Sequence, residues 1–279
     1  MNDSNDTTAA APADATSSLA DTATAPGARQ TAVQTGSFVL VAAPRSGSNL
    51  LRDLLDQHAS IRCLGEIFKD RAINRKQWQR LSGGIAPLNA ELRHLRETDV
   101  VAFWKTILGK YRVDKPVLGA KIFYHHREGQ EIWQYFASSR TPIIHLVREE
   151  LIDSYLSLML AEASWLWRQE KGASAETPYE RNIAIDLHRF EQYCRKFRRS
   201  FDSTEALFKD NPYRRVTYAA LVNDRAQTMS GVYSFLDLPD QETSTRLTKQ
   251  LSRPREEVIT NWNEVASFIR ANEELCVVR

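Results

Sequence analysis

A short loop of small polar residues with one arginine is the strongest chemical signal in the sequence. It reads Arg45-Ser46-Gly47-Ser48-Asn49 and lies between an apolar run and the leucine-rich start of a helical pattern. The first backbone N–H groups of a helix have no partners within it, and the helix dipole adds partial positive charge there. Gly47 allows close backbone approach, the hydroxyls donate hydrogen bonds, and the Arg45 guanidinium matches phosphate or sulfate oxygens. The loop therefore predicts an anion site, against the alternative of an ordinary strand-to-helix turn with a capping serine.

The same loop lacks the residues that a metal-dependent kinase or nucleotide hydrolase requires. The phosphate loop of such enzymes reads Gly-x-x-x-x-Gly-Lys-Ser/Thr, in which the lysine contacts phosphate and the hydroxyl binds Mg²⁺. Neither residue stands at the corresponding place here. The adjacent His125 and His126 have no third ligand at metal-binding spacing. The sequence therefore favours a nucleotide or anion site that works without a metal ion.

A second arginine follows another apolar run. Arg148 comes directly after residues 142–147 and precedes a long helical pattern that contains Ser157. At about 100° per residue, nine residues would place these two side chains on opposite sides of one helix, so they converge only if Arg148 precedes the helix. Arg148 then lies at the carboxyl edge of the sheet beside the first loop, where α/β proteins bind ligands. The alternative is a surface ion pair with Glu149 or Glu150.

The elements that must position these residues follow from the hydrophobic pattern. Short β-branched runs alternate with longer runs whose apolar residues recur every three or four positions, the order of a parallel sheet covered by helices. Strands are expected at 38–43, 116–122, 142–147 and 214–218. Helices are expected at 49–57, 100–111, 129–138, 150–170, 183–208, 224–236 and 255–270. Ser48 or Asn49 is the expected N-cap of the first helix. The predicted fold class is therefore α/β.

Composition excludes several classes of protein. The 279 residues are 42% hydrophobic and 26% charged with a net charge of +2, so no overall field attracts nucleic acid. No apolar stretch approaches the ~20 residues that a membrane-spanning helix needs. Three widely spaced cysteines without metal-ligand spacing suit reduced thiols in the cytoplasm. Residues 1–35, rich in Ala, Thr, Ser and Asp, are expected to form a disordered tail, and residues 36–279 a single domain.

Three segments, in this order, resemble the sulfotransferases that use 3′-phosphoadenosine-5′-phosphosulfate (PAPS). They read Ala-Pro-Arg-Ser-Gly-Ser-Asn-Leu (43–50), Leu-Gly-Glu-Ile-Phe (64–68) and Ile-His-Leu-Val-Arg-Glu-Glu-Leu-Ile-Asp-Ser-Tyr-Leu-Ser (144–157). The likeness is strongest to bacterial carbohydrate sulfotransferases of the Nod-factor and trehalose 2-sulfotransferase type, and it covers most of residues 37–270. It implies a P-loop-like α/β fold with a central parallel sheet flanked by helices.

The resemblance also assigns residues to the two ends of PAPS. The loop residues 45–49 would hold the 5′-phosphosulfate, with Arg45 also acting on the charge that develops during transfer. Arg148 and Ser157 would hold the 3′-phosphate. Glu150 stands where many relatives have Asn or Asp, and a carboxylate beside a phosphate is unfavourable unless it points away. The Arg-Lys-Gly signature of the cytosolic aryl and steroid enzymes is absent near the C-terminus, which disfavours that subfamily.

The acceptor hydroxyl needs a base. Glu66 aligns with the glutamate proposed as base in related enzymes, and its apolar neighbours predict a raised pKa. The alternative for Glu66 is a turn cap or an ion pair with Arg62 or Lys69. His58 is the competing base because cytosolic relatives use a histidine, but its place at the end of the first helix favours capping. Lys121 is expected either to contact the sulfuryl group or the acceptor, or to be a solvated lysine at a strand end.

These features together predict a cytoplasmic, metal-independent sulfotransferase that uses PAPS as co-substrate and a glutamate as general base. We expect the acceptor to be a hydroxyl of a carbohydrate, a glycolipid or another small molecule, and we expect no nucleic-acid partner. The alternatives are a kinase or nucleotide hydrolase on the same scaffold, and a nucleotide-binding protein without catalysis. The sequence leaves open a homodimer, and also a peripheral membrane contact through the basic run within 183–208.

Overall fold

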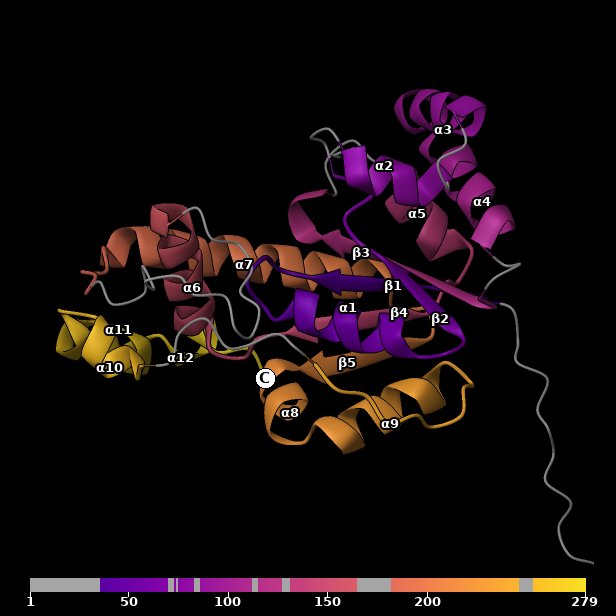
Figure 1. Cartoon of the computed structure of the whole chain (residues 1–279). Coiled ribbons are helices and arrows are strands. Elements are labelled where there is room, and N and C mark those ends of the chain that lie inside the picture. The colour runs from indigo at the N-terminus through magenta and orange to yellow at the C-terminus, as the bar shows by residue number, and fades with distance from the viewer. Residues whose placement is uncertain are drawn as a thin grey trace, which may run out of the picture. The chain divides into compact units, whose positions relative to one another are not determined.

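A five-stranded parallel sheet forms the centre of the fold (Figure 1). The computed structural model describes residues 36–69, 73, 75–82, 86–111, 115–126, 131–164, 182–245 and 253–279. All of these residues fall within one unit, Val33–Arg279. The tail predicted at residues 1–35 lies outside the described residues.

The strands follow the sequence pattern closely, with one addition. They are β1 (Gly36–Ala42), β2 (Ile61–Leu64), β3 (Val117–Phe123), β4 (Ile143–Val147) and β5 (Tyr213–Thr217), in the order β2-β3-β1-β4-β5. The four predicted strands are confirmed to within two residues at each end. The hydrophobic pattern did not predict β2, because this strand has only four residues and carries Arg62 in its interior.

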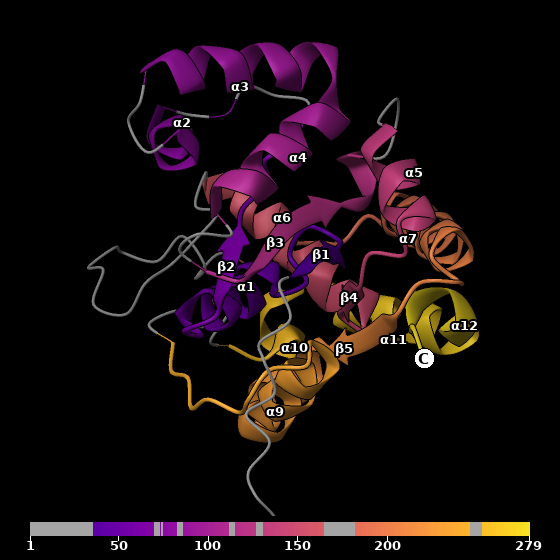
Figure 2. The same ribbon diagram turned by 90° about the vertical axis from the view of Figure 1, so that its right-hand side faces the viewer.

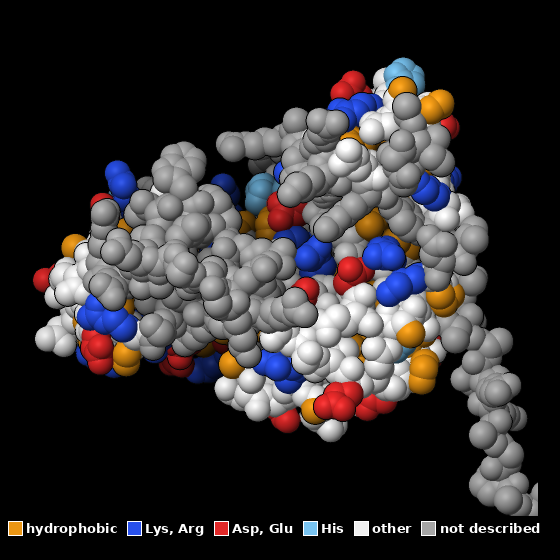
Figure 3. All heavy atoms as spheres, viewed as in Figure 1, with side chains coloured by type: hydrophobic (Ala, Val, Ile, Leu, Met, Phe, Trp, Pro, Cys, Tyr) orange, Lys and Arg blue, Asp and Glu red, His pale blue; other side chains and the backbone are white. Residues whose placement is uncertain are grey.

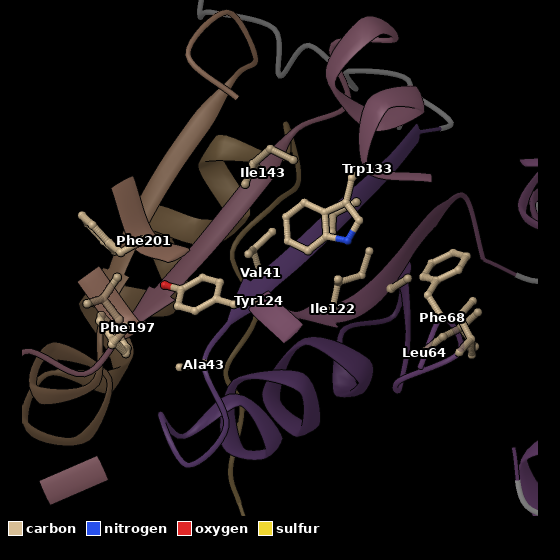
Figure 4. Packing of buried hydrophobic residues seen from close by; sticks show 14 of the residues in the cluster. Val41, Ala43, Leu64, Phe68, Ile122, Tyr124, Trp133, Ile143, Phe197 and Phe201 are labelled. Carbon is tan, nitrogen blue, oxygen red and sulfur yellow. The ribbon is translucent and has the colours of Figure 1, made fainter. Parts of the chain in front are cut away.

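The central strand β1 is buried on both sides, as a parallel strand covered by helices must be. Successive side chains of a strand point to opposite faces. Phe38 and Leu40 pack in one hydrophobic cluster and Val39 and Val41 in the other, all with no exposed surface. In a close view, Trp133 lies over the strands near Val41 (Figure 4). An unbroken apolar run in the sequence therefore gives a two-sided core.

Helices cover the two faces of the sheet in separate layers. On the face of Phe38 lie α1 (Ser48–Gln57), α8 (Tyr218–Asn223) and α9 (Arg225–Phe235), each contributing buried apolar residues to the same cluster. The view along the strands shows α1 and α9 on one side of the sheet and α4, α5 and α7 on the other (Figure 2). The cluster on that second face takes residues from the following elements: α2 (Arg75–Ser82), α3 (Ala86–Thr98), α4 (Val100–Tyr111), the short helix η1 (Tyr124–His126), α5 (Glu131–Ser138), α6 (Leu151–Ser164), α7 (Leu187–Leu207), α10 (Arg255–Val258), α11 (Trp262–Ala271) and α12 (Glu273–Cys276).

The helix predictions differ from the structure in two respects. The predicted helix 255–270 is wrong as a single element, because Ile183 forms a parallel bridge with Ile259 and so separates α10 from α11. The pattern missed α2, α3, α8 and α12. Residues 165–170 of the predicted helix 150–170 lie outside the described residues, and the other predicted helices are confirmed to within four residues.

A polar group is buried in the middle of the sheet. His145 of β4 has no exposed surface, and its two ring nitrogens form hydrogen bonds with the hydroxyls of Tyr124 and Tyr213. Its ring stacks on Phe201. Burial, with a smaller contribution from the positive charge of Arg215, lowers the pKa of His145 to about 3. The imidazole is therefore neutral around pH 7.

Candidate active site

The loop between β1 and α1 contains two residues with left-handed backbone conformations. The φ angle is 65° at Arg45 and 91° at Gly47. A Cβ atom on Gly47 would lie 2.4 Å from Cδ2 of the Tyr218 ring, so only glycine fits beneath that ring. The fully buried Ser46 hydroxyl donates to the carbonyl of Ala43 at 2.7 Å and so fixes the turn.

The first turn of α1 is open at its N-terminus. The N-cap is Gly47, not Ser48 or Asn49 as the sequence predicted, and glycine has no side chain to cap the helix. The first intrahelical bond runs from the N–H of Leu51 to the Gly47 carbonyl at 3.1 Å. The preceding amides of the turn are therefore available to an anion, aided by the helix dipole.

The structure brings both predicted arginines and Ser157 to this loop. Arg148 follows β4 and precedes α6, as the convergence argument required. Its Nη1 donates to the carbonyl of Arg45 at 3.3 Å. The Nε of Arg45 in turn donates to the Ser157 hydroxyl at 3.0 Å. Residues more than a hundred positions apart thus meet at the carboxyl ends of β1 and β4.

Arg148 is held on several sides although it carries a charge. The residue is only 9% exposed, and its Nη2 lies 3.3 Å from Oδ2 of Asp153. Its guanidinium lies over the ring of Tyr218, 4.6 Å from the ring centroid. The buried Nε has no hydrogen-bond partner within the described part of the chain. Sequence reasoning missed Tyr218, although it is the last residue of the strand predicted at 214–218 and so belongs to the same edge of the sheet.

Glu150 points away from this site. Its carboxylate pairs with Arg255 of α10. Its backbone forms an antiparallel bridge with Val277, and the N–H of Val278 donates to the carbonyl of Glu149 at 2.9 Å. The carboxylate at position 150, a departure from the family pattern, is therefore compensated by Arg255.

Lys121 is buried inside β3, not solvated at a strand end. Its side chain is 2% exposed. The ammonium donates to Oδ1 of Asn49 at 2.8 Å and lies 3.0 Å from Oε1 of Glu66. Lys121 therefore links the loop after β1 to the segment after β2. Burial lowers its pKa, and the charge of Glu66 opposes that decrease.

The pKa of Glu66 differs from the prediction. Burial is the largest single influence and raises the pKa, as the apolar neighbours suggested. The charge and hydrogen bond of Lys121, with smaller contributions from His126 and Lys69, outweigh it and lower the pKa below its usual value. The predicted increase is therefore wrong, because the decisive partner lies in a different strand. Glu66 is a carboxylate around pH 7, and about a third of its side chain is exposed.

His58, the competing base, is used for structure. The residue is the C-cap of α1 and is 1% exposed. Its Nδ1 accepts from the N–H of Ser60 at 3.0 Å, so its Nε2 donates to the carbonyl of Pro239 at 3.1 Å. Both ring nitrogens are therefore occupied, at the end of α1 that is remote from the loop.

One series of contacts joins the predicted residues into a single site. It runs through Glu66, Lys121, Asn49, the loop backbone, Arg45, Ser157 and Arg148. The site lies where β1 and β4 are neighbours but their connections lead to opposite ends of the sheet. Such a switch point is where open α/β sheets bind ligands.

Comparison with known proteins decides the family. The model of the sulfotransferase family matches residues 37–242, which include every residue of this site. The chain belongs to the sulfotransferase family. Nodulation protein H of Rhizobium meliloti (strain 1021) is 23% identical to this sulfotransferase over 236 residues, which are 82% of this chain and 89% of that protein.

Solved structures of sulfotransferases are also similar to this one. A sulfotransferase from Alicyclobacillus acidocaldarius has a TM-score of 0.47 and 14% identity, over 86% of this chain and 94% of that chain. The sulfotransferase domain from the curacin biosynthetic pathway has a TM-score of 0.45 and 18% identity, over 81% of this chain and 83% of that chain.

One face of this sulfotransferase carries charged side chains of both signs. Lys or Arg side chains and Asp or Glu side chains lie intermixed on the face shown in Figure 3. Arg62 and Asp56 form one pair of opposite charges, 3.8 Å apart. The described residues contain no group of three or more His, Cys, Asp or Glu that could hold a metal ion. No helix among them is long and apolar enough to span a membrane.

Proposed function

We propose that this sulfotransferase transfers a sulfuryl group from PAPS to a hydroxyl of a carbohydrate, a glycolipid or another small acceptor, in the cytoplasm and without a metal ion. The observation that carries the proposal is the contact series from Arg148 to Glu66. In this series, the loop that we propose to bind the anion lies between a buried arginine on one side and a carboxylate on the other.

The residues around the loop suit a ligand with two anionic groups. A buried N–H without a partner is costly, so the free Nε of Arg148 favours an acceptor atom supplied by a ligand. The Ser157 hydroxyl accepts from Arg45, which leaves its own O–H to donate. We assign the 3′-phosphate to Arg148 and Ser157, and the 5′-phosphosulfate to residues 45–49 at the open end of α1.

The acceptor side supplies a base and positive charge. PAPS supplies an activated sulfuryl group: a bond forms between the acceptor oxygen and sulfur, and the bond from sulfur to the 5′-phosphate oxygen breaks. The Glu66 carboxylate accepts the proton that the acceptor hydroxyl loses. Lys121 beside the loop and Arg45 within it supply positive charge, which offsets the charge that remains on the departing phosphate oxygen. Positive side chains thus take the place that Mg²⁺ has in kinases.

Calorimetric titration tests the donor site. Adenosine 3′,5′-bisphosphate (PAP) is titrated into the protein beside 5′-ADP and ATP, each with Mg²⁺ and with a chelator. The proposal expects PAP to bind most tightly, equally well without Mg²⁺, and at least tenfold more weakly to Arg148→Ala. Tighter binding of ATP with Mg²⁺ would overturn the proposal in favour of a kinase or hydrolase.

Turnover with radiolabelled PAPS tests the base. Acceptors are screened among oligosaccharides, glycolipids and small alcohols, and the best is used to compare variants. Glu66→Gln is expected to lower kcat by about 10²- to 10⁴-fold, because proton transfer by a positioned base contributes that much. Its affinity for PAP should stay within about threefold. Glu97→Gln, on the exposed surface of α3, is the matched control. Unchanged turnover of Glu66→Gln would remove Glu66 from this role.

A further inference from the structure

Asp153 lies between two arginines from distant parts of the chain. Its Oδ2 is 3.3 Å from Nη2 of Arg148, and its Oδ1 is 3.2 Å from Nη1 of Arg255. The same Nη1 also contacts Glu150. Each oxygen of the Asp153 carboxylate therefore serves a different arginine.

The sharing of Asp153 by two arginines prevents the usual pairing, in which one arginine and one carboxylate form two parallel hydrogen bonds. Arg148 makes only one contact with Asp153, since Arg255 occupies the second oxygen. The remaining edge of the Arg148 guanidinium, with its buried and unpartnered Nε, is left for another acceptor. Without Arg255, both oxygens of Asp153 would be free to pair with the Nε and Nη2 groups of Arg148, and its uncompensated negative charge would repel a phosphate.

Arg255 is itself fixed by its surroundings and lies beyond the loop residues. Its guanidinium lies over the ring of Trp262 at 5.2 Å, and its Nε is 3.4 Å from Glu256. The bridge between Glu150 and Val277 holds the segment after β4 against the C-terminal part of the chain. The 255–279 segment is thus attached to the segment that carries Arg148.

We infer that Arg255 is a positioning residue, which occupies Asp153 and so keeps the Arg148 guanidinium free to select a nucleotide with a 3′-phosphate. The inference rests on the proposed function, because it assigns the 3′-phosphate to Arg148. Arg255 itself does not touch the ligand. Arg255 therefore affects only how much more tightly the site binds a nucleotide with a 3′-phosphate than one without it.

The test compares PAP with AMP, which lacks only the 3′-phosphate. The selectivity of each variant is the ratio of the AMP Kd to the PAP Kd. Arg255→Met is expected to reduce this ratio at least tenfold, mainly by weakening PAP, while the AMP Kd changes less than twofold. Adding Asp153→Asn to Arg255→Met should restore most of the ratio, because an uncharged amide neither captures Arg148 nor repels phosphate. Arg270→Met, on the exposed side of α11, is the control that keeps the wild-type ratio.

The outcomes separate this inference from the proposed function. If the wild-type protein binds PAP no better than AMP, the 3′-phosphate site itself fails. If the wild type discriminates and Arg255→Met discriminates equally, only the inference fails. If Arg255→Met weakens PAP and AMP binding equally and the double variant does not recover, Arg255 has a merely structural role. That result would also overturn the inference. Arg255→Gln, a smaller change, is measured beside Arg255→Met with the same expectation, and thermal unfolding checks that each variant is folded.

Discussion

Lys121 and Glu66 determine each other's ionisation. The lysine is almost fully buried, and the charge of Glu66 opposes the decrease in its pKa that burial causes. Burial would raise the pKa of Glu66, and the charge and hydrogen bond of Lys121 more than reverse that effect. Lys121 is therefore the main cause of the lowered pKa of the carboxylate that we propose as base.

Replacement of Lys121 by methionine should raise the pKa of Glu66. The substitution removes the main cause that lowers this pKa and leaves burial, the main cause that raises it, in place. The Glu66 side-chain carboxyl carbon is followed by NMR through a pH titration and assigned by its absence in Glu66→Gln. Lys105→Met, on the exposed surface of α4, is the control. A Glu66 pKa that stays at the wild-type value in Lys121→Met would contradict the pairing.

Residue identities were easier to predict than residue environments. Arg45 and Arg148 were predicted to approach each other because each follows a strand, and parallel strands end at one edge of the sheet. The raised pKa predicted for Glu66 was wrong because its neighbours in sequence are apolar, whereas Lys121 lies in another strand. Ionisation depends on distant partners, which a single sequence does not identify.

At the scale of elements, the loop from β1 to α1 depends on one glycine. Gly47 is the N-cap of α1, has φ of 91°, and lies directly beneath the ring of Tyr218. The guanidinium of Arg148 also lies over this ring. A side chain at position 47 would therefore disturb the loop and the neighbouring arginine together.

Gly47→Ala should destabilise the protein by about 1–3 kcal/mol and weaken PAP binding at least tenfold. The cost arises from a left-handed conformation that alanine adopts poorly and from a Cβ atom 2.4 Å from the Tyr218 ring. Urea denaturation and PAP titration measure the two effects. Gly109→Ala is the matched control, because a Cβ there meets nothing within 4 Å inside α4, and it should be neutral or slightly stabilising. Equal behaviour of the two variants would refute the argument.

Helices and strands were predicted correctly where burial imposes a clear hydrophobic pattern on the sequence. The predicted strands that became β1 and β4 carry continuous apolar runs, and the long helix α7 carries a regular apolar stripe. Prediction failed for β2, which is short, and for the break between α10 and α11, where a bridge from Ile183 interrupts the helix. That interruption comes from a partner more than seventy residues away, so the local pattern contains no sign of it.

At the scale of the whole molecule, His145 makes stability depend on pH. Its pKa is about 3 in the folded state, against an ordinary value of 6.5. Between these values the unfolded chain binds a proton that the folded chain does not. Stability therefore falls as the pH decreases from 6.5 towards 3.

Wild-type protein should lose up to about 1.4 kcal/mol of unfolding free energy per pH unit through His145 in this range. His145→Gln, which keeps a polar side chain between the two tyrosines, should lack this contribution. Urea denaturation of both proteins at pH 7, 6 and 5 gives the comparison. If the unfolding free energies of the two proteins depended on pH in the same way, His145 would not titrate as its burial requires.

The arrangement of the whole sheet explains why much of the candidate site was predictable. The loops after β1 and β4 meet because those strands are adjacent and their connections diverge. The attachment of the C-terminal segment was not predictable, because Glu150 and Arg255 are 105 residues apart and no motif joins them. Site residues on strand ends follow from the fold class, whereas ion pairs between distant segments depend on the final packing.

The fluorescence of Trp262 can report on the position of Arg255. Arg255 places its charge over that ring, and Asp153 connects the same arginine to Arg148 at the loop. Indole emission changes in colour and intensity when a nearby charge moves. We therefore expect events at Arg148 to change the fluorescence of Trp262, one of the six tryptophans of the sequence, through the contacts of Arg255 and Asp153.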